Sequence, residues 1–288
     1  MTNTTAGTNY GKEIRGVVPI IPNSTIGPYL LRPDLPVPRN ILTKTHCTGY
    51  CTDCPAFAFV HTVESFQRGC GQTFVDSPLE NDFYNASIVA KAVHLIRNPF
   101  ENLVARKHLG LKTVLRDNPK IIDGMNASAA LLALDTKEGL QHWCDFLDRR
   151  FLFLENRRKK NGLSTLDSDL MSYFEGVPCA SELFRYLRWH DRVIAMTKSL
   201  NMTVLYIHYE DYRTNYEATV SFLLNFLELT PVARPIPFVS DKTYEDLYDP
   251  QTARTMARFI EELATPETME HLHRYLDRWL NKADVIKP

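Results

Sequence analysis

Arg97 stands at a position where proteins commonly bind phosphate groups. The mostly apolar residues 90–96 before it are typical of a buried strand, and Asn98 and Pro99 after it are typical of a helix start. Glu101 has the spacing of a capping box with Asn98. A guanidinium beside the free N–H groups of a helix start can hold a phosphate through charge-assisted hydrogen bonds. The pattern therefore predicts an anion site at Arg97, with an ion pair between Arg97 and Glu101 as the alternative.

A second set of side chains that could do chemistry, Lys44, Thr45 and His46, ends a short strand predicted over residues 41–45. A histidine at the tip of a strand is a suitable general base near neutral pH. The residues alone also allow a structural or metal-binding histidine at this position.

A third strand is predicted over residues 203–209, and the acidic pair Glu210 and Asp211 follows it. We expect this pair to stabilise the fold rather than to react. In parallel sheets ligands bind outside the carboxyl ends of the strands. His46, Arg97 and Glu210 are therefore expected to face one crevice.

The elements that must position these residues alternate between strands and helices. Helical periodicity marks residues 100–109, 127–160, 182–200, 217–229, 253–263 and 267–280. This order predicts an α/β fold with a three-layer parallel sheet that has helices on both faces. We expect an irregular N-terminal segment over residues 1–40 with one short strand near residues 17–21, a core over residues 41–230, and a helical C-terminal extension over residues 231–288. A cysteine-rich insertion is expected over residues 47–85 of the core.

The motifs occur in the order found in one enzyme family. Lys44-Thr45-His46, the stretch from Arg97 through Asn98-Pro99, and Tyr209-Glu210-Asp211 resemble three strand ends of the sulfotransferases that use 3′-phosphoadenosine 5′-phosphosulfate (PAPS). The resemblance covers roughly residues 36–230 and is closest to the Golgi-type carbohydrate sulfotransferases. It implies a fold similar to the P-loop nucleotide hydrolases.

The resemblance also implies roles for single residues. His46 would be the catalytic base, and Lys44 would lie near the transferred sulfuryl group. Arg97 would bind the 3′-phosphate of the nucleotide, with Thr45 and Arg106 as further nucleotide contacts. PAPS would be the co-substrate, its desulfated form PAP the product, and a hydroxyl, expected to be on a carbohydrate, the acceptor. No metal cofactor is implied.

The chain departs from the family pattern at two places. Ala105 occupies the position of a family serine that contacts the 3′-phosphate. The glycine-rich phosphosulfate loop, typically Pro-Lys-x-Gly-Thr-Thr-Trp, has no counterpart before Lys44; residues 7–13 have a similar composition but lack the flanking strand and helix. Two explanations stay open: a loop upstream of this sequence, or a catalytically inactive nucleotide- or glycan-binding module.

The cysteines allow three interpretations. Cys47, Cys51 and Cys54 have the spacing of a radical-enzyme iron–sulfur triad, and together with Cys70 or His61 they could hold zinc. Disulfides are the preferred interpretation, since the chain has an even number of cysteines, 6 in total. A metal-binding enzyme that uses the three clustered cysteines is therefore a further alternative function.

Composition narrows the partners and the compartment. The net charge of −1 disfavours a general nucleic-acid binder. No apolar run could span a bilayer, so a membrane link is expected only through an anchor outside this sequence. Glycosylation sequons begin at Asn3, Asn23, Asn85, Asn126 and Asn201. With the even number of cysteines, which a luminal protein could pair, they favour the Golgi lumen or another secretory compartment, with the cytoplasm as the alternative. The sequence does not indicate an oligomeric state.

The helix predicted over residues 127–160 is basic toward its end. Arg149 and Arg150 lie in its middle, and Arg157, Arg158, Lys159 and Lys160 close it. A solvated helix face explains such charges, and attraction of an acidic glycan or of the nucleotide is the functional alternative.

Overall fold

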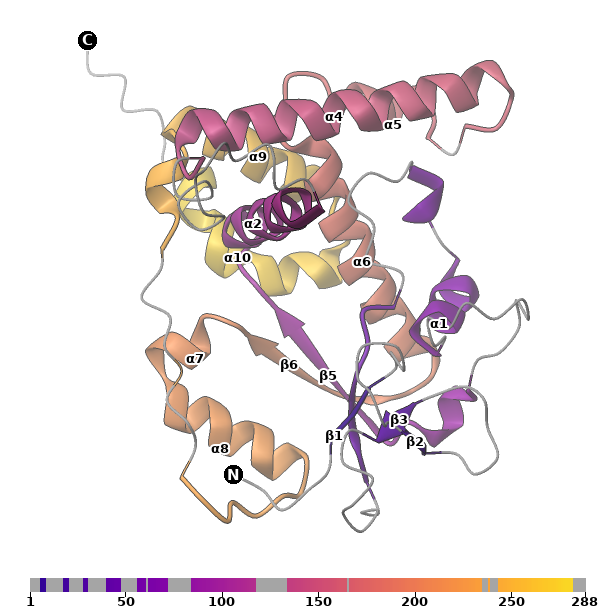
Figure 1. Cartoon of the computed structure of the whole chain (residues 1–288), viewed down its shortest axis with the longest axis vertical. Helices are drawn as coiled ribbons and strands as arrows, with labels where there is room; N and C mark the ends of the chain where they lie inside the picture. Colours follow the sequence, from indigo (N-terminus) through magenta and orange to yellow (C-terminus); the bar gives the residue numbers. More distant parts are fainter. Residues whose placement is uncertain are drawn as a thin grey trace.

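In the part of the chain that the structure describes, the protein has a mixed α/β structure with two small sheets and a large helical layer (Figure 1). The computed structural model describes residues 6–8, 18–20, 28–30, 40–47, 56–60, 62–71, 84–117, 134–164, 166–234, 238 and 243–281. Among these residues, no helix is long and apolar enough to cross a membrane.

The first sheet has the strand order β2-β3-β1-β4. Its strands are β1 (Ala6–Thr8), β2 (Val18–Pro19), β3 (Tyr29–Leu30) and β4 (Leu42–Lys44). β1 runs parallel to β4, while β3 is antiparallel to both β1 and β2. Gly7 lets the strands approach closely, because a Cβ there would lie 2.9 Å from Thr43 Oγ1. The described part of residues 1–40 thus contains the predicted strand, as β2, and also β1 and β3.

The second sheet is a parallel pair, β5 (Lys91–Ile96) and β6 (Thr203–His208), in register from Lys91 opposite Thr203 to Ile96 opposite His208. The crossover between them contains α2 (Pro99–Asp117), α4 (Lys137–Lys160), α5 (Ser168–Ser172) and α6 (Ala180–Ser199). Within the described residues β4 and β5 belong to different sheets. The α/β class is confirmed, but the predicted three-layer parallel sheet is not.

Two helices close the fold after the sheet. α9 (Pro250–Leu263) and α10 (Pro266–Leu280) confirm the helices predicted near the C-terminus. Each begins at a side-chain cap followed by proline: Asp249 accepts hydrogen bonds from the backbone of α9, and Thr265 does so for α10. The buried α6 residue Asp191 adds a link, since its Oδ1 accepts hydrogen bonds from Thr265 and Thr268.

The main core lies among the long helices. Its buried members include Leu103 of α2, Phe151 of α4, Phe184 of α6, Ile260 of α9 and Leu276 of α10, each at most 1% exposed. Burying such side chains is the main favourable term in folding, about 1.5–3 kcal/mol each. This core fixes the position of α6, the helix whose side chains contact the ends of β4 and β5.

The remaining helices are short. They are α1 (Val63–Gly71), α7 (Asp211–Thr214), α8 (Tyr216–Phe226) and the 3₁₀ turns Ala56–Ala58, Ala86–Ile88 and Glu245–Leu247. The segment predicted as a loop-rich insertion thus contains α1, which packs on α6 through Phe66 and Val193.

Two disulfides tie the elements together. Cys47–Cys70 joins the end of β4 to α1, and Cys144–Cys179 joins α4 to the start of α6. The preference for disulfides is confirmed at these four cysteines. Cys51 and Cys54 lie outside the described residues. A metal site that needs the Cys47 thiolate is not formed, because that sulfur is bonded to Cys70.

Candidate functional site

The Arg97 guanidinium lies between an aromatic ring and a carboxylate. Its Cζ is 4.6 Å from the centre of the Tyr209 ring, a residue that directly follows β6. Its Nη2 is 3.7 Å from Glu101 Oε2, so the predicted alternative, an ion pair with Glu101, exists at long range. The Arg97 side chain is 25% exposed and its Nε has no hydrogen-bond partner within the described residues. A cation–π contact therefore holds this cation at the surface, where an anion can reach it.

The start of α2 is only partly as predicted. Asn98 is the N-cap, because its Oδ1 accepts a hydrogen bond from Phe100 N at 3.0 Å. The capping box with Glu101 is wrong, however, since Asn98 N donates to Glu210 Oε1 at 2.9 Å. Pro99 has no N–H. An anion at the predicted site would therefore depend on the Arg97 guanidinium rather than on these backbone groups.

Glu210 connects three elements around the site. Its Oε1 caps the start of α2, and its Oε2 accepts a hydrogen bond from Tyr275 Oη of α10 at 2.5 Å. The same Tyr275 oxygen is 2.8 Å from His208 Nδ1 at the end of β6. Asp211 forms an ion pair with Arg274 of α10 at 2.7 Å. These contacts agree with the structural role expected of the acidic pair.

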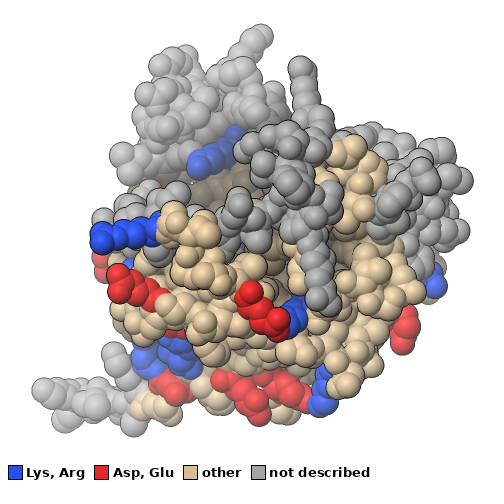
Figure 2. All heavy atoms as spheres, turned by 90° about the horizontal axis from the view of Figure 1, so that it is seen from below, with Lys and Arg blue, Asp and Glu red and all other residues tan. Residues whose placement is uncertain are grey.

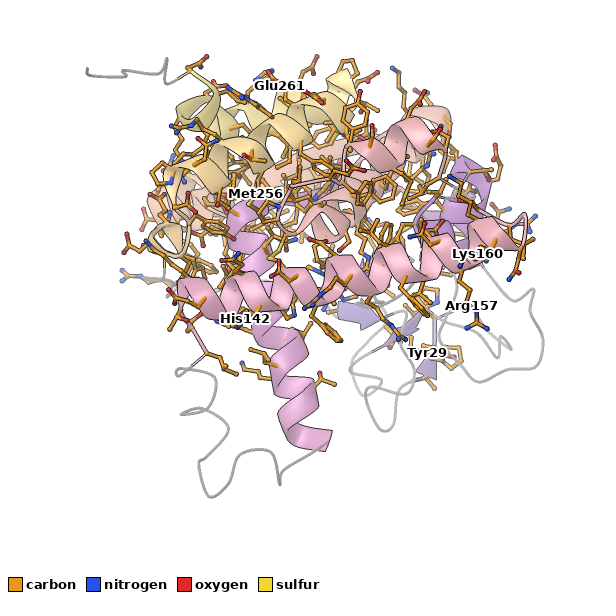
Figure 3. All side chains as sticks on the ribbon, turned by 90° about the horizontal axis from the view of Figure 1, so that it is seen from above. Tyr29, His142, Arg157, Lys160, Met256 and Glu261 are labelled. Atoms are coloured by element: carbon orange, nitrogen blue, oxygen red, sulfur yellow. A yellow bond between two sulfur atoms is a disulfide. The ribbon has the colours of Figure 1, made fainter. Side chains whose placement is uncertain are left out.

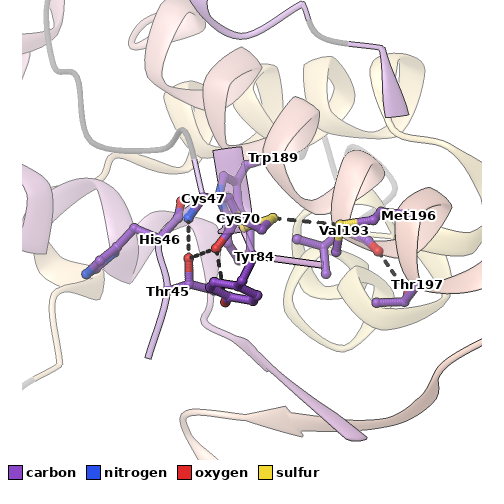
Figure 4. The surroundings of a disulfide bond; sticks show 9 residues. All are labelled: Thr45, His46, Cys47, Cys70, Tyr84, Trp189, Val193, Met196 and Thr197. Carbon is purple, nitrogen blue, oxygen red and sulfur yellow. Dashed lines mark hydrogen bonds between the residues drawn. A yellow bond between two sulfur atoms is a disulfide. The ribbon is translucent and has the colours of Figure 1, made fainter. Parts of the chain in front are cut away.

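The Lys44-Thr45-His46 segment is fixed through its backbone and one hydroxyl. Thr45 Oγ1 donates to Cys70 O at 3.0 Å and accepts from Cys47 N at 3.1 Å. Lys44 and Thr45 are exposed, and His46 is half-buried. Figure 4 shows the imidazole of His46 pointing away from the disulfide and its neighbours. The disulfide thus holds the chain while the imidazole extends away from it.

Helix α6 anchors both candidate groups. Tyr186 Oη donates to Arg97 O at 2.7 Å, and Trp189 Nε1 donates to His46 O at 3.0 Å. Residues three apart on a helix are surface neighbours, about 5–6 Å between their Cβ atoms. Adjacent turns of one buried helix therefore position the backbone of the predicted anion-binding arginine and of the predicted base, although their strands belong to different sheets.

Arg106 lies deeper in α2 and is engaged with α6. Its Nε forms an ion pair with Glu182, which is 1% exposed and also binds Arg185. Ala105 precedes it on α2. The Nε of Arg106 is engaged with Glu182, so a contact with the nucleotide would have to use the terminal amino groups of its guanidinium. This contact stays a prediction.

The sequence analysis missed a buried histidine pair behind the site. His94 Nε2 of β5 is 2.7 Å from His190 Nδ1 of α6, and both residues are at most 6% exposed. Burial lowers the pKa of His94 to about 3 and that of His190 well below its usual value, with His208 and His271 nearby adding repulsion. The sequence did contain a signal for the burial of His94. His94 lies two residues before the apolar Ile96 in the strand, so the two side chains point to the same face of the sheet, which is buried.

We expect acidification to destabilise the protein through this pair. His94 stays neutral in the folded state but is protonated in the unfolded state below pH 6.5. Stability should therefore fall as the pH drops below 6.5, by about 2 kcal/mol at pH 5 from His94 alone. Urea unfolding at pH 5 and at a pH above 6.5 measures this difference in the free energy of unfolding. His94→Gln should flatten the dependence, whereas the same change at the exposed His142 should not; equal slopes in all three proteins would contradict the prediction.

No protein-family model, curated protein or solved structure matches this chain. Its function therefore has to be argued from the residues and contacts described above.

Proposed function

We propose that this protein is a sulfotransferase that moves a sulfuryl group from PAPS to a hydroxyl of a carbohydrate. The observation that carries the proposal is the double anchor on α6. Tyr186 and Trp189 bind the backbone at Arg97 and at His46, which are the residues that nucleotide binding and proton removal require. We also infer that β4, β5 and β6 belong to a sulfotransferase-type three-layer fold.

The proposed reaction needs one base and one cation. His46 takes the proton from the acceptor hydroxyl, whose oxygen forms a bond to the sulfur of PAPS. The bond from that sulfur to the bridging oxygen breaks, and PAP leaves with the electron pair. Lys44, exposed on the same strand end, stabilises the negative charge on the leaving oxygen. As in phosphoryl transfer, positioning and electrostatics carry most of this catalysis.

The nucleotide is held from the β5 side. Arg97, supported by the Tyr209 ring, binds the 3′-phosphate. The Thr45 hydroxyl already donates its proton to Cys70 O, so Thr45 contributes through its backbone N–H instead. Arg106 contributes a further nucleotide contact through its terminal amino groups, because its Nε pairs with Glu182.

A phosphate cradle has one supporting feature. β1 (Ala6–Thr8) overlaps the start of residues 7–13, and its Thr8 lies opposite Lys44 in the parallel register. The chain therefore leaves β1 beside the Lys44-Thr45-His46 segment, where the 5′-phosphosulfate would bind. Residues 9–17 lie outside the described residues.

The compartment inference has two supports. The Cys47–Cys70 and Cys144–Cys179 disulfides agree with an oxidising compartment, and Asn85 and Asn201, two of the sequon asparagines, are exposed. We propose the lumen of the secretory pathway, with the Golgi as the site expected for glycan sulfation.

A non-catalytic nucleotide- or glycan-binding module is the second candidate. It is favoured by the occupied N–H groups at the start of α2 and by the carboxylate of Glu101 near Arg97, since both weaken phosphate binding.

Nucleotide binding tests the proposed site. Arg97→Ala should weaken PAP by about 2 kcal/mol, roughly thirtyfold, because a charge-assisted pair to the 3′-phosphate is lost. Adenosine 5′-phosphate, which has no 3′-phosphate, should be nearly unaffected. Ala105→Ser should tighten PAP modestly by restoring a hydroxyl donor. Titration calorimetry measures all of these.

The matched control is Arg213→Ala, an exposed arginine on α7 near the same strand end. It should leave both affinities within a factor of about two. If Arg97→Ala weakens both nucleotides equally, Arg97 is structural and the nucleotide site lies elsewhere.

A further inference from the structure

A cavity of about 320 Å³ with a mixed polar and apolar lining opens between α4 and α5, apart from the site described above. Phe174 and Met171 form part of its apolar wall. Its polar lining residues are Glu155, Asn156, Lys159, Ser164, Ser168, Ser172 and Glu175, and the carboxylate of Glu155 is buried and accepts a hydrogen bond from Ala56 N. This volume is at the lower end of the range for small-ligand pockets, and hydroxyls, an amide and both charge signs together suit a polyhydroxylated ligand.

The cavity adjoins a stripe on the exposed face of α4. Arg149, Phe153, Asn156 and Lys160 follow one another at the spacing that puts residues on one helix face. All four are exposed, and Phe153 shows 59% of its surface to solvent. Arg149 Nε donates to Asp145 O, which leaves its two terminal amino groups for a ligand. Asn156 belongs to both the stripe and the cavity, so one ligand can span them.

Exposed charges on this half of α4 are all positive. Arg149, Arg150, Arg157, Lys159 and Lys160 face solvent, whereas the carboxylate of Glu155 turns inward and accepts a hydrogen bond from Ala56 N. Figure 3 shows Arg157 and Lys160 at the C-terminal end of the helix. The helix dipole favours cations in the last turn only, and Arg149 lies well before it. On the opposite face of the molecule, basic and acidic side chains are interspersed over the described surface (Figure 2).

We propose that the α4–α5 cavity and the Arg149–Phe153–Lys160 stripe bind an acidic oligosaccharide. A sugar ring enters the cavity and bonds to Asn156 and the serine hydroxyls. The next ring stacks on Phe153, and carboxylate or sulfate groups pair with Arg149 and Lys160.

Two other polyanions fit less well. A lipid surface needs a continuous apolar face, but the exposed rings Phe146 and Phe153 are seven residues, about 10 Å, apart with arginines between them. Nucleic acid is disfavoured by the net charge of −1. The site uses neither Arg97 nor His46, so it stands independently of the proposed sulfuryl transfer.

Calorimetry with an oligogalacturonate tests the proposal on the full chain, with a neutral maltooligosaccharide of equal length as the comparison. We expect binding of the acidic sugar, about tenfold weaker in Arg149→Glu and about a hundredfold weaker when Lys160→Glu is added. Asn156→Trp, which fills the mouth of the cavity, should also weaken it. Lys137→Glu makes the same charge change about 18 Å from Arg149 on α4 and should change the affinity less than twofold.

Three results would overturn the proposal. One is the absence of oligogalacturonate binding at millimolar concentration in the unaltered protein. Another is an equal loss in Lys137→Glu, which would mean that only overall charge matters. The last is stronger binding to phosphatidylserine vesicles than to the sugar, with the same dependence on Arg149, which would assign the stripe to a membrane surface. PAP binding through Arg97 should be unchanged in every variant.

Discussion

Replacing His46 by alanine should lower sulfuryl transfer about a hundredfold or more. A positioned general base contributes on the order of 10²–10⁴ to such reactions, and no other histidine lies in the Lys44–Cys47 strand end. PAP affinity should be nearly unchanged, because the backbone of residue 46, which Trp189 binds, remains. The measurement is transfer of labelled sulfuryl from PAPS to a carbohydrate acceptor, together with PAP calorimetry.

His142→Ala is the control for this variant, since His142 is an exposed histidine on α4. It should keep full activity. Turnover that survives in His46→Ala would remove His46 from the reaction, and loss of PAP affinity in the same protein would show that the imidazole supports the fold instead.

Removing the Cys144–Cys179 disulfide should destabilise the protein by about 4 kcal/mol. The bond closes a loop with a sequence separation of 35, and the chain-entropy estimate for a loop of that size is about 4 kcal/mol. Both cysteines are buried, so Cys144→Ala with Cys179→Ala also loses packing. This is a large share of the 5–15 kcal/mol typical of folded domains. Urea unfolding of the double variant measures it.

The disulfide acts together with Asp148, one turn further along α4. Asp148 Oδ1 accepts a hydrogen bond from Ser181 N and so caps α6, which has no side-chain cap of its own. Burial raises the pKa of Asp148 to about 6. The Cys47→Ala, Cys70→Ala pair is the comparison and should lose about 3 kcal/mol, since its separation is 23. Peptide mapping without reductant that finds all four thiols free in oxidising buffer would contradict both values.

Local features of the sequence proved the most predictable. Asn98-Pro99 identified the start of α2, because an N-cap and a first-turn proline need only neighbouring residues. The predicted capping box is absent because Glu210, 112 residues away, accepts the hydrogen bond from Asn98 N that Glu101 was expected to accept. This competition depends on the tertiary structure, so the residues around Asn98 in the sequence cannot reveal it. The signal Asp249-Pro250 for the true start of α9 was present and was missed.

The grouping of strands was beyond sequence reasoning. β1 and β3 are three and two residues long, too short for an alternating pattern to mark them. β1 pairs with β4 through the close contact at Gly7, β3 pairs with β1, and within the described residues β4 and β5 belong to different sheets. For the candidate site, the sequence identified Arg97 and the Lys44–His46 segment. It did not predict the hydrogen bonds from Tyr186 and Trp189 that hold their backbone, because an aromatic residue on a buried helix can equally well serve only to fill the core.

The Tyr275 contact with Glu210 has a consequence for synthesis in the cell. Tyr275 lies in α10, which follows β5, α6 and β6 in the sequence, and through Glu210 it holds the residues that cap α2 beside Arg97. A ribosome releases residues in order, so a nascent chain that already contains β5, α6 and β6 still lacks this clasp. The Arg97 region can reach its final arrangement only after α10 has emerged and docked. Chaperones would therefore bind this protein while the ends of β5 and β6 still lack their contact with α10. A chain that stops before α10 would stay in that state.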